Sequence, residues 1–139
     1  MASMIFNSAL RDEAIGSIDF DTDTFKVMLV TSAYTPNKDT HTKRSDVTNE
    51  VSGTGYTAGG AASAVSVAAV DTVNDRVVIT FGAVSWTTAT ITARGAVYYK
   101  SHGGASSADE LIAYDDFGSD IVSTAGTFSL AASTITKQN

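Results

Sequence analysis

The clearest pattern along the chain is a series of short apolar runs separated by polar and glycine-containing stretches. In residues 25–31 (FKVMLVT), apolar side chains occur at both odd and even positions from Val27 onward. Successive strand side chains point to opposite faces, so this run predicts a central strand buried on both faces. Further strands are predicted at residues 61–70, 76–81, 84–86, 94–100, 111–117 and 127–136.

Three other stretches depart from this pattern. Residues 71–75 separate two strands and end in Asn-Asp, which predicts a hairpin turn. Residues 4–14 carry apolar side chains at helical spacing and predict a short helix that ends at Gly16. Residues 32–60 hold the only proline and have no periodicity, so they predict one long loop, with a helical turn capped by Ser45. A loop of this length is usually functional or disordered.

Together these elements predict an all-β (mainly β) chain in which residues 1–139 form one domain. The spacing of the strands is typical of an antiparallel β-sandwich or jelly roll, here with a short N-terminal helix and one long loop. No long helices alternate with the strands, which argues against a doubly wound parallel sheet.

Composition removes several classes of function. The chain has 15 acidic and 9 basic residues and a net charge of −6, which argues against a nucleic-acid partner. It has no cysteine and only His41 and His102, so a disulfide or a zinc site of sulfur and nitrogen ligands is not expected. No apolar run is long enough to span a membrane, and the first residues lack the pattern of a signal peptide.

One acidic motif invites comparison with a calcium site. Asp19, Asp21 and Asp23 alternate as in an EF-hand loop. That loop also needs glycine at its sixth position and glutamate at its twelfth, where this chain has Thr24 and Val30. We therefore expect a solvated turn before the strand, and no metal.

Other candidate sites for chemistry also fail their patterns. The glycines of residues 53–60 are followed by no lysine, so a phosphate loop is not expected. His41 and His102 lie in polar, loop-like sequence, and no Gly-x-Ser-x-Gly motif accompanies them. The acidic pairs at 109–110 and 115–116 resemble solvated charge more than a tuned acid–base pair. We expect no catalytic residue, no cofactor and no enzyme activity.

Aromatic residues suggest self-association. Tyr98 and Tyr99 are neighbours on a predicted strand and should face opposite ways, one buried and one exposed. Trp86 is expected in the core or at an interface. Together with the two-sided apolar strand, these aromatic residues give more apolar surface than one thin sandwich readily hides. We expect a homo-oligomer, with a dimer favoured over a trimer.

Two stretches of the chain resemble a family of small virion proteins from tailed bacteriophages: residues 18–41 (IDFDTDTFKVMLVTSAYTPNKDTH) and residues 44–60 (RSDVTNEVSGTGYTAGG). Some members of that family resemble capsid cement, or decoration, proteins built as jelly rolls. The resemblance implies a structural role on the outer surface of the phage head, with the major capsid protein as partner, after synthesis in the host cytoplasm. It implies no catalytic residue. A tail-tip or fibre-associated module that recognises a host surface is the alternative.

The long loop is the predicted docking element. It holds three of the nine basic residues and ends in glycines, so it is expected to contact the capsid and to become ordered on binding. The alternative is that it covers a sheet edge. The residues expected to form the docking loop are Lys38, Lys43, Arg44, Gly53, Gly55 and Tyr56.

Overall fold

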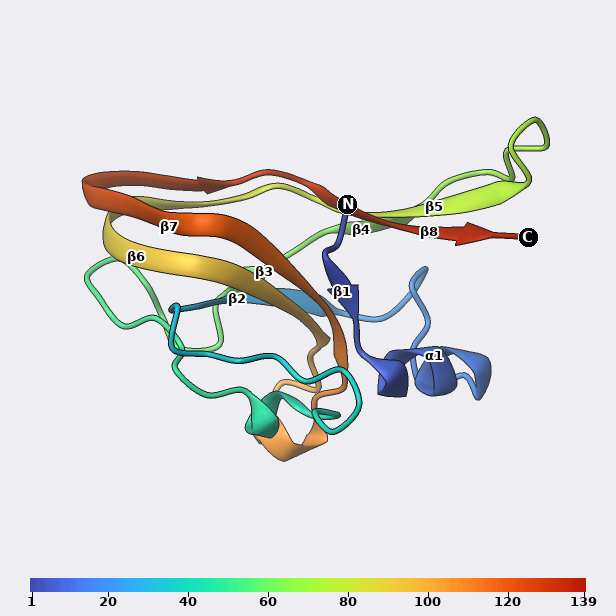
Figure 1. Ribbon diagram of the computed structural model, residues 1–139, viewed down its shortest axis with the longest axis horizontal. Coiled ribbons are helices and arrows are strands. Elements are labelled where there is room, and N and C mark those ends of the chain that lie inside the picture. Colours follow the sequence, from blue (N-terminus) through green and yellow to red (C-terminus); the bar gives the residue numbers. More distant parts are fainter.

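The computed structural model describes residues 1–139 and forms two antiparallel sheets joined into one body (Figure 1). One sheet has five strands in the order β1-β7-β6-β2-β3, and the other has three in the order β4-β5-β8. This confirms the mainly β, two-sheet architecture. The elements in chain order are β1 (Met4–Ile5), α1 (Asn7–Ala14), β2 (Phe25–Val30), the 3-10 helix η1 (Arg44–Asp46), β3 (Ala61–Ala62), β4 (Val65–Val67), β5 (Arg76–Phe81), β6 (Val84–Lys100), the 3-10 helix η2 (Ser106–Ala108), β7 (Leu111–Leu130) and β8 (Ser133–Gln138).

A single long ribbon links the two sheets. Strand β5 pairs with β8 and β6 pairs with β7, and the same antiparallel alignment runs through both pairs. The ribbon doubles back at one end of the molecule, so that its two halves lie in different sheets (Figure 1). At this bend the register shifts between Trp86 and Ile91, and Thr88 and Ala125 have φ values of +50° and +45°. Such irregularities bend a strand sharply.

The main core lies between the two layers of the folded ribbon. It contains 21 buried residues, including the stacked pair Phe20 and Phe25, both of which meet Phe81 edge-on. Trp86 belongs to this core and is only 6% exposed. Burying each large apolar side chain contributes roughly 1.5–3 kcal/mol, so this interior is the main source of stability.

The outer face of the five-stranded sheet is buried as well. A second cluster of eight residues lies there, with Met28 and Val30 from β2 at its centre. The prediction of a central strand that is apolar on both faces is therefore confirmed. Tyr98 is 0% and Tyr99 is 1% exposed, so the expectation that one of them faces solvent is wrong. Both faces of β2 are covered within one chain, and this apolar surface no longer argues for an oligomer.

Several predicted elements have different bounds in the structure. Residues 84–86 and 94–100 belong to one strand, because small residues at the bend continue the pairing without a regular apolar pattern. The helix begins at Asn7, and residues 4–5 form β1 instead. The helix does end where Gly16 adopts φ of +81°, as expected. The predicted hairpin turn is present: Asp71 bridges to Arg76 across it.

No helix of the protein has the length and apolar character needed to cross a membrane.

At the bend of the ribbon, we expect an alanine-to-glycine substitution to stabilise the fold. Ala125 is exposed and has a left-handed backbone that disfavours any side chain, so Ala125→Gly should raise the free energy of unfolding by up to about 1 kcal/mol. Ala132 is also exposed but does not have a positive φ, and Ala132→Gly should lower it by about 0.4–1 kcal/mol. Urea denaturation of both variants measures this. Equal losses in the two would contradict strain at the bend.

Candidate functional site

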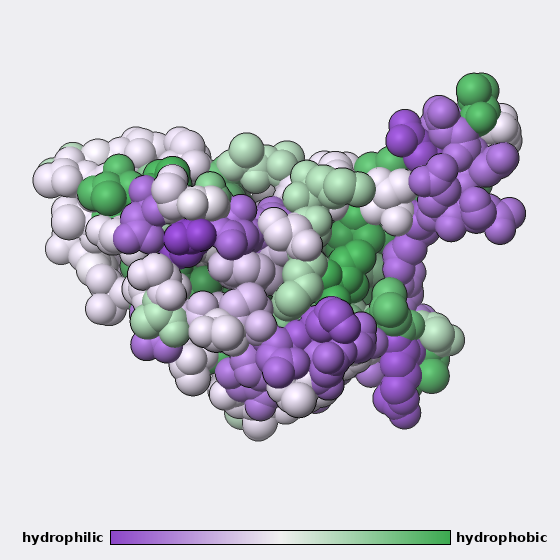
Figure 2. Space-filling model, in the orientation of Figure 1, coloured by the Kyte–Doolittle hydropathy of each residue, from purple (hydrophilic) through white to green (hydrophobic).

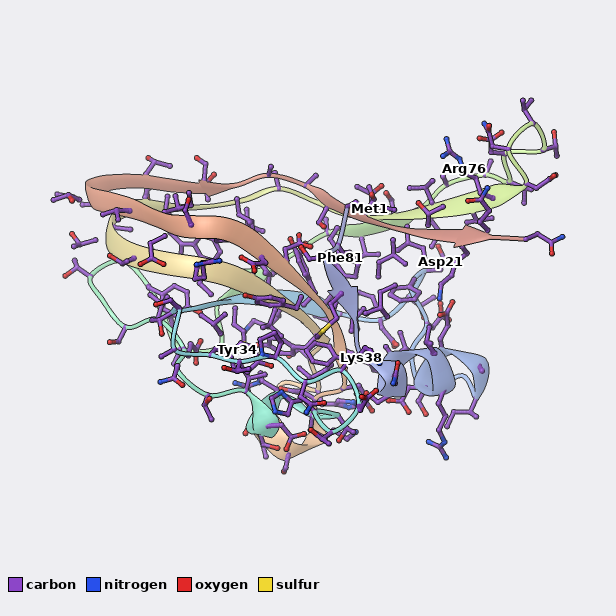
Figure 3. All side chains as sticks on the ribbon, viewed as in Figure 1. Met1, Asp21, Tyr34, Lys38, Arg76 and Phe81 are labelled. Carbon is purple, nitrogen blue, oxygen red and sulfur yellow. The ribbon has the colours of Figure 1, made fainter.

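The long segment of residues 32–60, here called the cover segment, packs across the outer face of the five-stranded sheet. Its Tyr34 is 4% exposed and belongs to the outer cluster, and its Val51 is 4% exposed and belongs to the main core. In Figure 3, Tyr34 and Lys38 both lie on this layer, below the sheet. These two side chains belong to the buried clusters, whereas most of the segment is exposed, as expected from its lack of periodicity.

The cover segment also closes the free edge of β2. Beyond the short strand β3, the Leu29 N–H donates to the hydroxyl of Tyr56 at 2.9 Å. The Leu29 carbonyl accepts from the Val51 N–H at 2.9 Å, and the Thr31 N–H donates to the Asn49 carbonyl at 2.9 Å. Edge strands in natural proteins are commonly protected by such loops. Within the chain, this segment therefore covers a sheet edge, which was the alternative to a docking role.

Arg44 anchors the cover segment to the loop that joins β6 to β7. Its Nε lies 2.7 Å from Oδ2 of Asp109, and the two side chains are 19% and 1% exposed. The Arg44 N–H donates to the Asp109 carbonyl, and the guanidinium lies 5.1 Å from the centre of the Tyr99 ring. The His102 N–H donates to the second oxygen of Asp109 at 2.8 Å. Arg44 is thus mainly a structural anchor.

Glu110 forms a second charged contact beside this anchor. Its two carboxylate oxygens lie 3.4 Å from Nζ of Lys43 and 2.7 Å from Nε2 of His102. Burial raises the pKa of Glu110, but the hydrogen bond to His102 and the charge of Lys43 outweigh it and hold the pKa below its ordinary value of 4.5. The charged form of Glu110 is therefore the one that the fold stabilises.

A chain of hydrogen bonds joins the C-terminal part of the cover segment to Tyr99 of β6. Tyr56 donates to Oε1 of Glu50 at 2.7 Å, and the Gly59 N–H donates to the same oxygen at 2.6 Å. The Gly59 carbonyl accepts from the Tyr99 hydroxyl at 2.6 Å. Burial raises the pKa of Tyr99 to about 12 and raises that of Tyr56 as well, so both hydroxyls stay protonated.

Gly53 and Gly55 lie against the bend of β6, where no side chain fits. A Cβ at Gly53 would stand 2.3 Å from the carbonyl oxygen of Thr90, and one at Gly55 would stand 2.8 Å from Cα of Ala89. Between the two glycines, the Thr54 carbonyl accepts a hydrogen bond from the Thr90 N–H. Close packing against β6 therefore explains these two glycines, and ordering of the loop on binding is not needed to explain them.

Lys38 is the most exposed of the three basic residues in the predicted docking set. Its side chain is 55% exposed and pairs with Asp39, whose side chain is 64% exposed. The side chain of Lys43 is 36% exposed. Gly53 and Gly55 are also exposed, although they pack closely against β6, whereas Arg44 and Tyr56 are partly buried and hold the cover segment in place. The helical turn expected at Ser45 begins at Arg44 instead, because Asp46 caps it through the Thr42 and Lys43 N–H groups.

The acidic turn before β2 is bonded within itself and to a neighbouring lysine. The Asp21 N–H donates to Asp19, and the Asp19 N–H donates to Asp23. Asp23 in turn pairs with Lys100 at 2.9 Å. Hydrogen bonds from neighbouring residues, first of all from the Asp21 N–H, lower the pKa of Asp19. The turn therefore positions the start of β2.

Sequence reasoning missed a group of exposed valines. Strands β4, β5 and β8, with the tip at residues 68–75, form an arm that projects from one end of the molecule (Figure 1). On it Val67, Val70 and Val73 are 43%, 68% and 88% exposed. A clue was present in the sequence, because valines continue through the turn where a hairpin usually has polar residues.

A groove of about 620 Å³ opens between the arm and the segment that follows α1. Figure 2 shows hydrophobic surface at the base of the arm, facing this opening. Asp21 lies between the arm and α1 (Figure 3). The lining of the groove combines five apolar residues with three acidic groups and one lysine: Ile18, Phe20, Val67, Val77, Ile79, Glu13, Asp19, Asp21 and Lys137.

The anchor predicts which charge matters for folding. Arg44→Met leaves Asp109 buried and unpaired, so the free energy of unfolding should fall by about 3–5 kcal/mol. Lys38→Met removes an exposed pair and should change it by less than about 0.5 kcal/mol. Chemical denaturation of the two variants measures the difference. Equal effects would contradict the anchoring role of Arg44.

Glu110 predicts a specific loss of stability in acid. A carboxyl whose pKa is depressed by folding stabilises the fold above its unfolded pKa, and this contribution is lost as the pH falls through the folded pKa. Stability should therefore decline as the pH drops below about 4.5, the unfolded value. Glu110→Gln should be less stable at neutral pH and show a smaller decline, measured by denaturation across pH 3–7. An unchanged decline would contradict this role.

Comparison with known proteins does not identify a family for this chain. Set against protein-family models, curated proteins and solved structures, the chain matches none. The likeness to small virion proteins therefore rests on residues 18–60 of the sequence. In the structure those residues form the acidic turn, β2 and the cover segment.

Proposed function

We propose that this chain is a structural virion protein of the capsid cement type, which binds the outer surface of a phage head and bridges neighbouring major capsid subunits. The observation that carries the proposal is the position of the exposed apolar side chains. Val70 and Val73 stand at the tip of the arm, whereas Ile121 and Val122 lie next to the bend of the ribbon. Hydrophobic surface is visible at both ends of the long axis (Figure 2).

A bridging protein needs two separated contact surfaces on a rigid body. Isolated surface valines are common, but groups of them on projecting elements favour a protein interface. The body between the two ends is stiffened by the folded ribbon and by the cover segment with its anchor at Arg44. The separation of the ends is thus held constant, as a bridge between neighbouring subunits requires.

The physical role of a cement protein is to favour the closed shell over separated subunits. A packaged genome presses outward, and a protein that binds two neighbours in the assembled lattice opposes their separation. Each contact can be weak, because the second contact forms at the high effective concentration set by the first. The net charge of −6 suits an outer position better than one against DNA.

The copy number per particle tests this function directly. A cement protein should be present in hundreds of copies, in a fixed ratio to the major capsid protein, and should be absent from isolated tails. The measurement is quantitative gel or mass-spectrometric analysis of purified heads and tails. A handful of copies confined to the tail would overturn the proposal in favour of a tail-tip or fibre module.

Substitutions at the two ends test the bridging surface. Val73→Asp and Val122→Asp should each weaken binding to emptied particles by about tenfold, since burying a valine contributes roughly 1.5 kcal/mol or more. Both side chains are exposed, so the fold should be unchanged. Thr48→Asp places the same charge on an exposed position of the cover segment and is the matched control. Binding of all three variants at the wild-type level would contradict the assignment.

A further inference from the structure

Strand β4 lies at a free edge of the three-stranded sheet and carries an unusual sequence. No charged residue occurs between Glu50 and Asp71, although the chain has 24 charged side chains in all. Residues 64–70 (AVSVAAV) consist of alanine, valine and one serine, without proline. All of them except the half-buried Val65 are exposed. Uncharged segments without proline on an open edge are the ones that can pair with another strand.

The backbone of this segment has its free hydrogen-bonding groups on one side. The Ala68 N–H donates to the Val78 carbonyl at 2.9 Å, and the Ala64 carbonyl accepts from the Gly82 N–H at 2.7 Å. Even-numbered residues therefore bond to β5. In an antiparallel ladder the intervening residues point their N–H and C=O groups to the opposite side. For Val65, Val67 and Ala69 that side has no strand, because β4 ends the sheet.

Two other edges of the protein, those of β2 and β8, are protected. The edge of β2 is closed by β3 and by the cover segment. The edge of β8 bears Lys137, which pairs with Glu13, and its Thr134 carbonyl accepts a hydrogen bond from the Ala2 N–H. Charged residues and covering segments are the usual means of blocking edge-to-edge pairing. Strand β4 has neither.

We propose that β4 pairs with β4 of a second copy of this chain. The pairing is antiparallel about a twofold axis at Val67, where each Val67 exchanges both main-chain hydrogen bonds with its counterpart. Val65 then lies opposite Ala69, and Ser66 lies opposite Ala68. The two three-stranded sheets become one continuous six-stranded sheet in the order β8-β5-β4-β4-β5-β8. The Val67 side chain, now 43% exposed, becomes buried against its counterpart.

A second copy fits this edge because the segment complements itself. At a twofold axis every residue near the axis meets its own equivalent, so a charge there would face a like charge. The run from Val65 to Ala69 carries none. Each copy has a net charge of −6, so two copies repel one another over most of their surfaces. At this uncharged edge the electrostatic repulsion is weakest, and contact is therefore least unfavourable there. Small and β-branched side chains also allow close approach of the strands.

The inference concerns the free protein and does not depend on the proposed virion function. If the chain dimerises but does not bind a phage head, the β4 pairing stands and the virion function is wrong. If the chain is a monomeric cement protein, only the β4 pairing is wrong. If both hold, the dimer doubles the contact surfaces presented to the shell, which strengthens binding through avidity.

Proline substitution at the free edge is the first test. Val67→Pro removes only an N–H that points away from β5, so the monomer should keep its fold. Thr136→Pro is the matched control, because Thr136 points its N–H to the free side of β8. Sedimentation over a concentration series should show a dimer for the wild type and for Thr136→Pro. Val67→Pro should associate at least about tenfold more weakly.

Charge complementation is the second test and does not rely on proline being tolerated. Val67→Lys and Val67→Glu should each be monomeric alone, and their equimolar mixture should form a heterodimer, detected by native mass spectrometry. A wild type that stays monomeric at high micromolar concentration overturns the proposal. So does a Val67→Pro dimer as tight as the wild type, an equal loss with Thr136→Pro, or a mixture that fails to associate. If only particle binding responds to Val67→Pro, the edge receives a capsid strand and the self-pairing is refuted.

Discussion

Strand β2 presents apolar side chains to both faces of its sheet, so both faces have to be shielded from water. Val27 and Leu29 point into the space between the layers, and Met28 and Val30 point to the outside of the sheet. A two-layer sandwich supplies a cover for only one of these faces. The ribbon formed by β5, β6, β7 and β8 folds over to cover the first, and the cover segment lies across the second. The bend, the long loop and its anchor are consequences of this one requirement.

The anchor explains why a polar, aperiodic segment can serve as a layer. A segment without regular strands has few backbone hydrogen bonds of its own, so side chains have to hold it in place. Arg44 and Asp109, 65 positions apart, supply a charged pair with little solvent around it, and Tyr56 substitutes for a strand at the edge of β2. Charge is used here to fix the conformation of a loop. Fewer basic groups are therefore left for contacts with other molecules, and Lys38 is the most exposed of those in this segment.

Local patterns were sufficient to predict the strands that alternate regularly. Residues 76–81 were predicted as a strand and form β5 with those bounds, and residues 25–31 differ from β2 by one position. The long strands β6 and β7 were divided into pieces, because small residues at the bend interrupt the apolar pattern while the pairing continues. The packing of residues 32–60 could not be predicted. Its contacts join residues far apart in sequence, and no local pattern records which carboxylate Arg44 will meet. The six predicted docking residues were therefore identified as a group by composition, although four of them serve the fold.

The contrast between the edges of the two sheets is the most informative feature for function. The chain devotes a glutamate, a tyrosine and several backbone groups to closing the edge of β2. Along β4 it places alanine, serine and valine and leaves the backbone of alternate residues without partners. Both edges face the same physical hazard, since any open strand can recruit another. A chain that blocks one edge so thoroughly has the means to block the other, and a single lysine in place of Ser66 would suffice. The unblocked edge is the feature that pairing of β4 with a second copy requires, because a charged side chain near the twofold axis would face its own equivalent.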